Sequence, residues 1–113
     1  MITEITQEEL WQKLSHPKKS VLLEVLPPEN YRQSHLPGAL NMPPEQVRTL
    51  ASELVPRNDM EVIVYGAGAE CDTSEKVAQQ LVTLGYSNVR RYVGGKREWM
   101  EAGLPMVEEN TAA

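Results

Sequence analysis

The sequence predicts an α/β fold built on a parallel sheet. Apolar runs typical of strands alternate with amphipathic segments typical of helices along the 113 residues, which is the pattern of strand–helix–strand units. Residues 21–26 form an almost unbroken apolar run, and such a run indicates a strand buried on both faces. Because parallel sheets are covered on both faces, we expect helices on each side of the sheet.

The first helix is marked by its capping residues. Thr6 followed by Glu9 is a capping-box pattern, which predicts a helix over residues 7–15. Because proline disfavours helical geometry in the residue before it, we expect His16 and Pro17 to end this helix. The other elements expected before residue 60 are a strand over 2–5, a strand over 21–26, a short helix over 28–34, a strand over 39–42 and a helix over 45–54.

The second half of the chain continues the alternation from a strand over residues 61–65. The helix that follows has apolar residues at helical spacing, and Gly85 stands where a left-handed glycine ends a helix. The polar end of the chain is typical of a frayed terminus. The remaining expectations are a strand over 88–93, a helix over 96–102, a single domain over 1–107 and a frayed tail over 108–113.

A loop of mostly small residues joins the strand over 61–65 to the next helix and holds the only cysteine. A strand–loop–helix unit directs backbone N–H groups and the positive end of a helix at the loop, so it can hold an anion or lower a thiol pKa. The small residues of the loop either keep these N–H groups accessible to an anion or serve only to turn the chain from the strand into the helix. Ligands of parallel sheets bind beyond the carboxyl ends of the strands. The candidate site is therefore Cys71 as nucleophile with the loop residues Gly66, Ala67, Gly68, Ala69, Glu70, Asp72, Thr73 and Ser74.

Cys71 allows two interpretations. Its place just before a helix favours the thiolate, which is the form that attacks sulfane sulfur. The acids on either side, Glu70 and Asp72, oppose a thiolate and fit a small structural loop residue. Thr73 or Ser74 is the expected N-cap of the helix rather than a catalytic hydroxyl, because neither histidine is placed to serve as its base.

Composition excludes several classes of function. One cysteine cannot form an intramolecular disulfide, and the two histidines stand far apart, so we expect neither a metal site nor a cofactor. The net charge of −5 opposes nucleic-acid and membrane binding as a main role. The N-terminus lacks a basic start with an apolar run, and no stretch approaches ~18 apolar residues. We expect a cytoplasmic protein.

Three blocks of sequence, in order, resemble the signatures of rhodanese-homology domains. They are the segments ENYRQSHLPGALN at 29–41, LGYSNV at 84–89 and VGGKREWMEAGLP at 93–105. The resemblance covers residues 5–106. It implies a three-layer α/β domain with a mainly parallel five-stranded sheet. It also implies transfer of sulfane sulfur from thiosulfate or a persulfide to a thiophile such as cyanide or a protein thiol.

The chain departs from the family pattern at the site. The family's nucleophilic cysteine follows the strand directly, at the position of Gly66, and the loop here is about two residues longer. Where the family has Asp-Val-Arg, this chain has Glu24, Val25 and Leu26, so the basic residue is lost. Glu24 either orients a neighbouring group or is a solvated acid, and His35 matches a family position that is mostly structural.

Three functions follow from these residues. The first is a sulfurtransferase or sulfur carrier that forms a persulfide on Cys71, takes sulfur from a small donor and gives it to a thiol acceptor. The second is an inactive domain that binds an anion or a protein partner. The third is a cysteine phosphatase, which needs a cysteine at the loop start and an arginine at its end. Gly66 and Thr73 supply neither.

Overall fold

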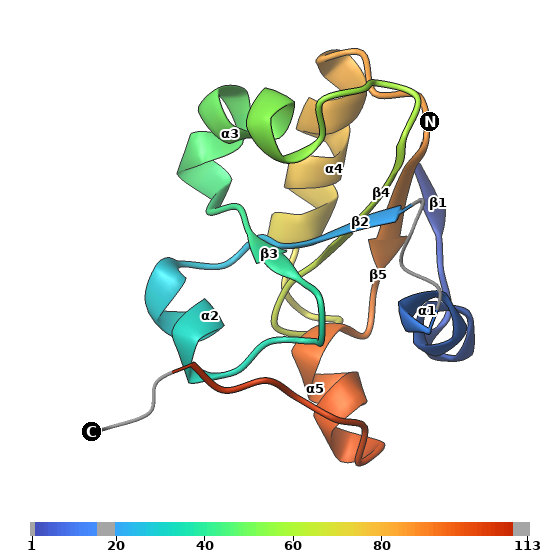
Figure 1. The fold of residues 1–113 in the computed structure, drawn as a ribbon, viewed down its shortest axis with the longest axis vertical. Coiled ribbons are helices and arrows are strands. Elements are labelled where there is room, and N and C mark those ends of the chain that lie inside the picture. The colour runs from blue at the N-terminus through green and yellow to red at the C-terminus, as the bar shows by residue number, and fades with distance from the viewer. Residues whose placement is uncertain (1, 16–19, 110–113) are drawn as a thin grey trace.

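The computed structural model describes residues 2–15 and 20–109, and in this part of the chain five strands form one parallel sheet (Figure 1). All four strand pairs are parallel, which confirms the expected α/β architecture. The predicted helix end at His16 and Pro17 lies outside the described residues. In spatial order the strands are β1 (Ile2–Glu4), β5 (Val89–Tyr92), β4 (Glu61–Tyr65), β2 (Ser20–Glu24) and β3 (Leu40–Asn41).

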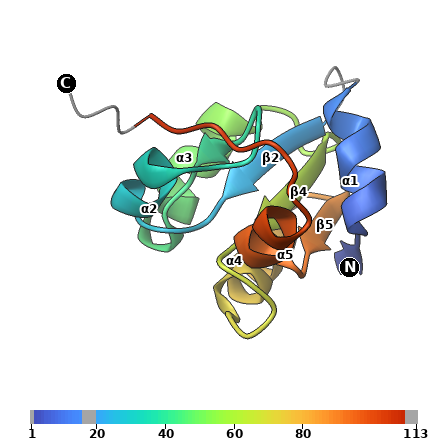
Figure 2. The ribbon, with the colours of Figure 1, turned by 90° about the horizontal axis from the view of Figure 1, so that it is seen from below.

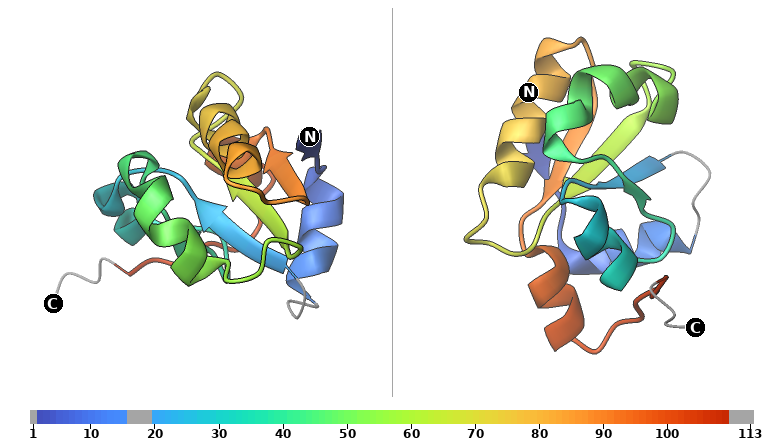
Figure 3. Two further views of the ribbon diagram at one scale, coloured as in Figure 1. Left: turned by 90° about the horizontal axis from the view of Figure 1, so that it is seen from above. Right: turned by 90° about the vertical axis from the view of Figure 1, so that its left-hand side faces the viewer.

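Helices cover both faces of the sheet and create two apolar layers (Figures 2 and 3). Side chains alternate between the two faces of a strand, so Leu23 and Val64 enter one layer while Leu22 and Ile63 enter the other. The first layer packs against α3 and α4, and the second against α1 and α5. The helical elements are α1 (Gln7–Leu14), α2 (Pro28–Gln33), the 3₁₀ helix η2 (Pro44–Gln46), α3 (Val47–Leu54), α4 (Thr73–Thr83) and α5 (Gly95–Glu101).

Local sequence signals account for several boundaries. Thr6 and Glu9 form the predicted capping box at the start of α1, with both reciprocal hydrogen bonds present. Gly85 follows α4 at φ +105°, a left-handed conformation that favours glycine. The helix expected over 45–54 begins instead as η2, which has Pro43 as its N-cap and Pro44 as its first residue. None of the helices in the described segments is both long and apolar enough to span a membrane.

The parallel register brings three strand ends to one edge of the sheet. Glu24 pairs with Tyr65, and Tyr65 pairs with Tyr92. The loop over residues 66–72 leaves this edge from β4, near the middle of the sheet, and lies beside the first turn of α5 (Figure 1). The candidate site is thus located at the carboxyl ends of the strands, as expected for a parallel sheet.

Candidate active-site loop

The first half of the loop is fastened to α5. The amide of Lys96 donates to the Gly66 carbonyl at 3.0 Å, and the amide of Arg97 donates to the Ala67 carbonyl at 2.9 Å. This close approach requires a glycine at the start of α5. Gly95 has φ +61°, and a Cβ there would lie 2.5 Å from the Gly66 oxygen, which is closer than nonbonded atoms allow. Two backbone segments far apart in the sequence therefore fix the path of the loop start.

The second half of the loop turns back toward its own beginning. The Cys71 amide donates to the Gly68 carbonyl at 3.1 Å, which closes a turn over residues 68–71. As a result, the Cys71 sulfur returns to the end of β4. A Cβ built on Gly66 would lie 3.6 Å from Cys71 Sγ, at ordinary van der Waals distance. The sulfur of Cys71 thus lies next to the space that a side chain at position 66 would enter.

The half-buried Cys71 thiol lies among loop residues that shift its pKa in opposite directions. Burial raises the pKa of the Cys71 thiol, and the charge of Asp72 also raises it. Hydrogen bonds from the hydroxyl and amide of Thr73 and from the amide of Ala67 outweigh both effects and lower the pKa below its ordinary value. The loop therefore favours the thiolate despite its acidic neighbours.

The orientation of one peptide unit explains how Ala67 reaches the sulfur. The peptide bonds of the described residues are trans, so the carbonyl and N–H of the unit between Gly66 and Ala67 point in opposite directions. Lys96 holds the carbonyl of this unit through its backbone amide, and the Ala67 N–H on the opposite side is one of the donors that lower the Cys71 pKa. The contact with α5 thereby aims a donor at the thiol.

The helix start differs from the sequence prediction. The N-cap of α4 is Asp72, and its side chain makes no capping hydrogen bond, so the expectation of Thr73 or Ser74 as N-cap is wrong. The two hydroxyls have other roles. That of Thr73 helps to lower the pKa of the Cys71 thiol, and Ser74 Oγ accepts from Arg91 Nε at 2.8 Å. At Ser74 a tertiary partner, Arg91, therefore replaces local capping.

Arg91 is a residue of the site that sequence reasoning missed. In addition to Ser74, its Nη2 donates to the Cys71 carbonyl at 3.3 Å. The signal that could have found it is the pair Arg90 and Arg91 in a short strand. Alternation places one of two adjacent strand residues on each face of the sheet, so one of these cations had to face α4.

The acids of the loop are paired with cations. Glu70 accepts from Arg97 Nη1 at 2.9 Å, and both side chains are largely exposed. The Asp72 carboxylate lies 3.4 Å from Lys76 Nζ in the first turns of α4. Exposed ion pairs of this kind contribute little to stability, but each places a cation beside an acid that opposes the thiolate.

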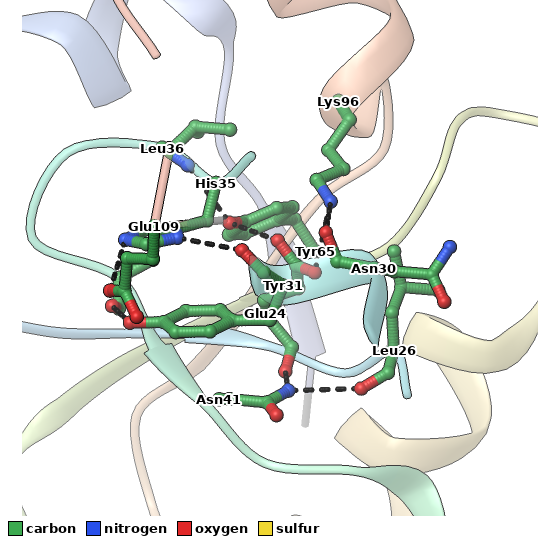
Figure 4. A network of polar contacts seen from close by, with 11 residues as sticks. Glu24, Leu26, Asn30, Tyr31, His35, Leu36, Asn41, Tyr65, Lys96 and Glu109 are labelled. Carbon is green, nitrogen blue, oxygen red and sulfur yellow. Dashed lines mark hydrogen bonds and ion pairs between the residues drawn. The ribbon is translucent and has the colours of Figure 1, made fainter. Parts of the chain in front are cut away.

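Glu24 lies in a buried network beside the loop (Figure 4). Its carboxylate accepts from the Tyr65 hydroxyl at 2.8 Å and from Lys96 Nζ at 3.0 Å. The Tyr65 hydroxyl also accepts from the Leu36 amide, and burial together with Glu24 raises the Tyr65 pKa far above its ordinary range. Glu24 is fully buried, so its interpretation as a solvated acid is wrong. It anchors Lys96, the residue whose amide holds Gly66.

His35 is engaged away from the loop (Figure 4). Its ring stacks on Tyr31 with a centroid distance of 3.8 Å, and its Nδ1 lies 2.9 Å from the Tyr31 carbonyl oxygen. Its Nε2 lies 3.4 Å from Glu109, and its backbone pairs with Val107. These contacts favour a structural role for His35, which fastens the segment after α5 to α2. Within residues 2–15 and 20–109, no three His, Cys, Asp or Glu side chains gather closely enough to hold a metal ion.

Comparison with known proteins identifies a family for this architecture. The sequence matches the rhodanese-like domain family over residues 6–102. It is 32% identical over 108 residues to a sulfurtransferase from Allochromatium vinosum, and the match covers 95% of this chain and 96% of that protein. It is 33% identical over 87 residues to the HTH-type transcriptional regulator Rv0324 from Mycobacterium tuberculosis. That match covers 77% of this chain but only 37% of the regulator.

A solved structure shows the same likeness. The thiosulfate sulfurtransferase from Pseudomonas aeruginosa superposes with a TM-score of 0.85 at 28% sequence identity. The superposition covers 95% of this chain and 20% of that protein. The fold of this chain therefore corresponds to one part of the longer Pseudomonas aeruginosa protein.

Proposed function

This chain belongs to the rhodanese-like domain family, and from that membership we propose that it is a sulfurtransferase or sulfur carrier that holds sulfane sulfur as a persulfide on Cys71. The observation that carries the proposal is the position of the Cys71 sulfur, 3.6 Å from where a Cβ on Gly66 would lie. The family resemblance assigns the nucleophile to position 66. Here glycine leaves that space free, and the longer loop returns a thiol to it.

The reaction needs only the thiolate and two partners. The Cys71 thiolate attacks the outer sulfur of thiosulfate, a new S–S bond forms, and the S–S bond of thiosulfate breaks as sulfite leaves with the electron pair. An acceptor thiolate then attacks the outer sulfur of the Cys71 persulfide. The bond from that outer sulfur to Cys71 breaks, and the Cys71 thiolate is regenerated. A persulfide donor serves equally, with its thiolate as the leaving group.

The loop stabilises both anions of this reaction, the Cys71 thiolate and the Cys71 persulfide. Hydrogen bonds from Ala67 and Thr73 lower the thiol pKa, so more of the protein carries the attacking form at neutral pH. A persulfide is also an anion, and amides that surround the thiolate remain beside it after sulfur is added. Ala67 and Ala69 are exposed and small, so they leave an approach to the sulfur for a donor or an acceptor thiol. We propose that this sulfur transfer takes place in the cytoplasm.

Intact-mass spectrometry tests the proposal. The reduced protein is incubated with thiosulfate or with glutathione persulfide, desalted and weighed. We expect the wild type to gain about 32 Da, the mass of one sulfur atom, and we expect Cys71→Ser to gain nothing. The alternative, an inactive domain that binds an anion or a protein partner, predicts no adduct in either protein.

A matched control tests whether sulfur loading needs the hydrogen-bond donors around Cys71 or only a thiol in the loop. In Ala69→Cys combined with Cys71→Ser, the loop still holds one cysteine, two positions away and at an exposed site. We expect this variant to load sulfur much more slowly than the wild type, because its thiol lies outside the set of donors around Cys71. Equal loading of the two proteins would show that any loop thiol suffices.

A further inference from the structure

Two adjacent arginines of β5 point to opposite faces of the sheet. Arg90 contacts Glu61, Glu9 and the carbonyl of Glu4 on the face covered by α1. Arg91 contacts the first turn of α4 on the opposite face, where Ser74 is almost fully buried. Of these two arginines, Arg91 is therefore the one that reaches the loop with the thiol.

The Arg91 guanidinium ties the end of the loop and the first turn of α4 to β5. Nε donates to Ser74 Oγ at 2.8 Å, and Nη2 donates to the Cys71 carbonyl at 3.3 Å. A guanidinium is planar and presents its donors in a fixed fork, so these two contacts set the position of one partner relative to the other. The last loop residues are thereby held against the start of α4.

We propose that Arg91 is a positioning residue for the reaction at Cys71: by fixing the Cys71 carbonyl against Ser74, it keeps the sulfur beside Gly66. This inference rests on the proposed function, in which that sulfur is the reacting atom. With the carbonyl held by Arg91 and the amide held by the Gly68 carbonyl, both backbone groups of Cys71 are fixed. Only rotation about the Cα–Cβ bond remains, and the sulfur stays within reach of Ala67 and Thr73.

Arg91 acts through the backbone rather than through direct contact with the thiol. Among the described residues its side-chain hydrogen bonds go to the Ser74 hydroxyl and the Cys71 carbonyl, and none goes to the sulfur. A substitution that keeps Arg91 and its charge but removes one of its hydrogen-bond partners should therefore reproduce part of the effect of losing Arg91. Ser74→Ala is that substitution.

The experiment compares Arg91→Gln with Arg90→Gln, which makes the same change of charge one residue away on the other face. The pH dependence of Cys71 alkylation gives the thiol pKa, and intact mass gives the rate of sulfur loading. We expect Arg91→Gln to raise the pKa and to slow alkylation at pH 7 by roughly threefold to tenfold. We expect Ser74→Ala to move the pKa in the same direction, Arg91→Lys to restore part of the wild-type value, and Arg90→Gln to leave it unchanged.

Three results would overturn the role of Arg91. One is an Arg91→Gln alkylation curve that superposes on that of the wild type, and another is an equal shift in Arg90→Gln. The third is a shift in Arg91→Gln that disappears at high salt while Ser74→Ala shows none, because this would indicate a charge effect. If Arg91→Gln fails to fold by circular dichroism, Ser74→Ala and Arg91→Lys decide the question. Failure of the wild type to load sulfur would refute the proposed function and leave the pKa comparison valid.

Discussion

Replacing Gly95 with alanine should damage both the stability of the protein and the reactivity of Cys71. Gly95 has φ +61°, and an added Cβ would lie 2.5 Å from the Gly66 oxygen and 2.9 Å from the Gly68 nitrogen. The loop start must move away from α5 to accommodate the methyl group. That movement breaks the hydrogen bonds from Lys96 and Arg97 to the loop carbonyls, and the Ala67 amide is no longer aimed at the thiol.

Gly103→Ala is the matched control, because this glycine follows the same helix at φ +73° and a Cβ there meets nothing within 4 Å. Both substitutions carry the left-handed backbone penalty of about 1–2 kcal/mol. Only Gly95→Ala also loses two hydrogen bonds of about 1 kcal/mol each. We therefore expect it to be less stable than the control by about 2 kcal/mol, a roughly thirtyfold difference in the unfolding constant.

Urea unfolding measures this difference, and the pH dependence of alkylation measures the Cys71 pKa in both variants. We expect the pKa to rise in Gly95→Ala and to stay at the wild-type value in Gly103→Ala. Equal unfolding free energies for the two variants, together with an unchanged Cys71 pKa, would refute the view that α5 aligns the loop.

Three further predictions concern the site and its support. Gly66→Cys combined with Cys71→Ser should load sulfur, because the new thiol at position 66 lies beside the same hydrogen-bond donors as Cys71. Intact mass checks this, and no adduct would mean that these donors do not activate a thiol at position 66. Lys96→Met should lower the unfolding free energy in urea by about 3 kcal/mol, since it leaves the buried Glu24 carboxylate without its cation; a loss below about 1 kcal/mol would mean that the pair behaves as an exposed one. Because the folded protein lowers the Cys71 pKa, the wild type should gain stability over Cys71→Ser as the pH rises from the folded to the unfolded pKa. Urea titrations across this pH range should show the gap widen and then level off, and a gap that narrows would contradict the lowered pKa.

Features set by neighbouring residues could be predicted from the sequence. The capping box of Thr6 and Glu9 predicts the start of α1, and the apolar run over 61–65 has the same bounds as β4. Gly85 ends α4 in the predicted left-handed conformation. These features depend on contacts within a few residues, so the sequence pattern contains the information needed. The parallel sheet followed in the same way from the alternation of strands and helices.

The path of the loop could not be predicted, because its determinants are distant in the sequence. The carbonyls at the two ends of the loop, those of Gly66 and Cys71, are held by Lys96 and Arg91, which lie on other elements. The predicted N-cap failed for the same reason, since tertiary contacts use the hydroxyl of Ser74. Loop composition indicated a candidate site, but the position of the Cys71 sulfur required the structure.

Sulfur carriage itself can be tested by discharge of the loaded protein. Wild-type protein is treated with glutathione persulfide, desalted to remove the donor and then mixed with an acceptor thiol, and its intact mass is followed over time. We predict that the adduct of about 32 Da on Cys71 disappears while an equal amount of sulfane sulfur appears on the acceptor. A protein that never gains this mass, or that keeps it in the presence of the acceptor thiol, would contradict a role for Cys71 in sulfur transfer.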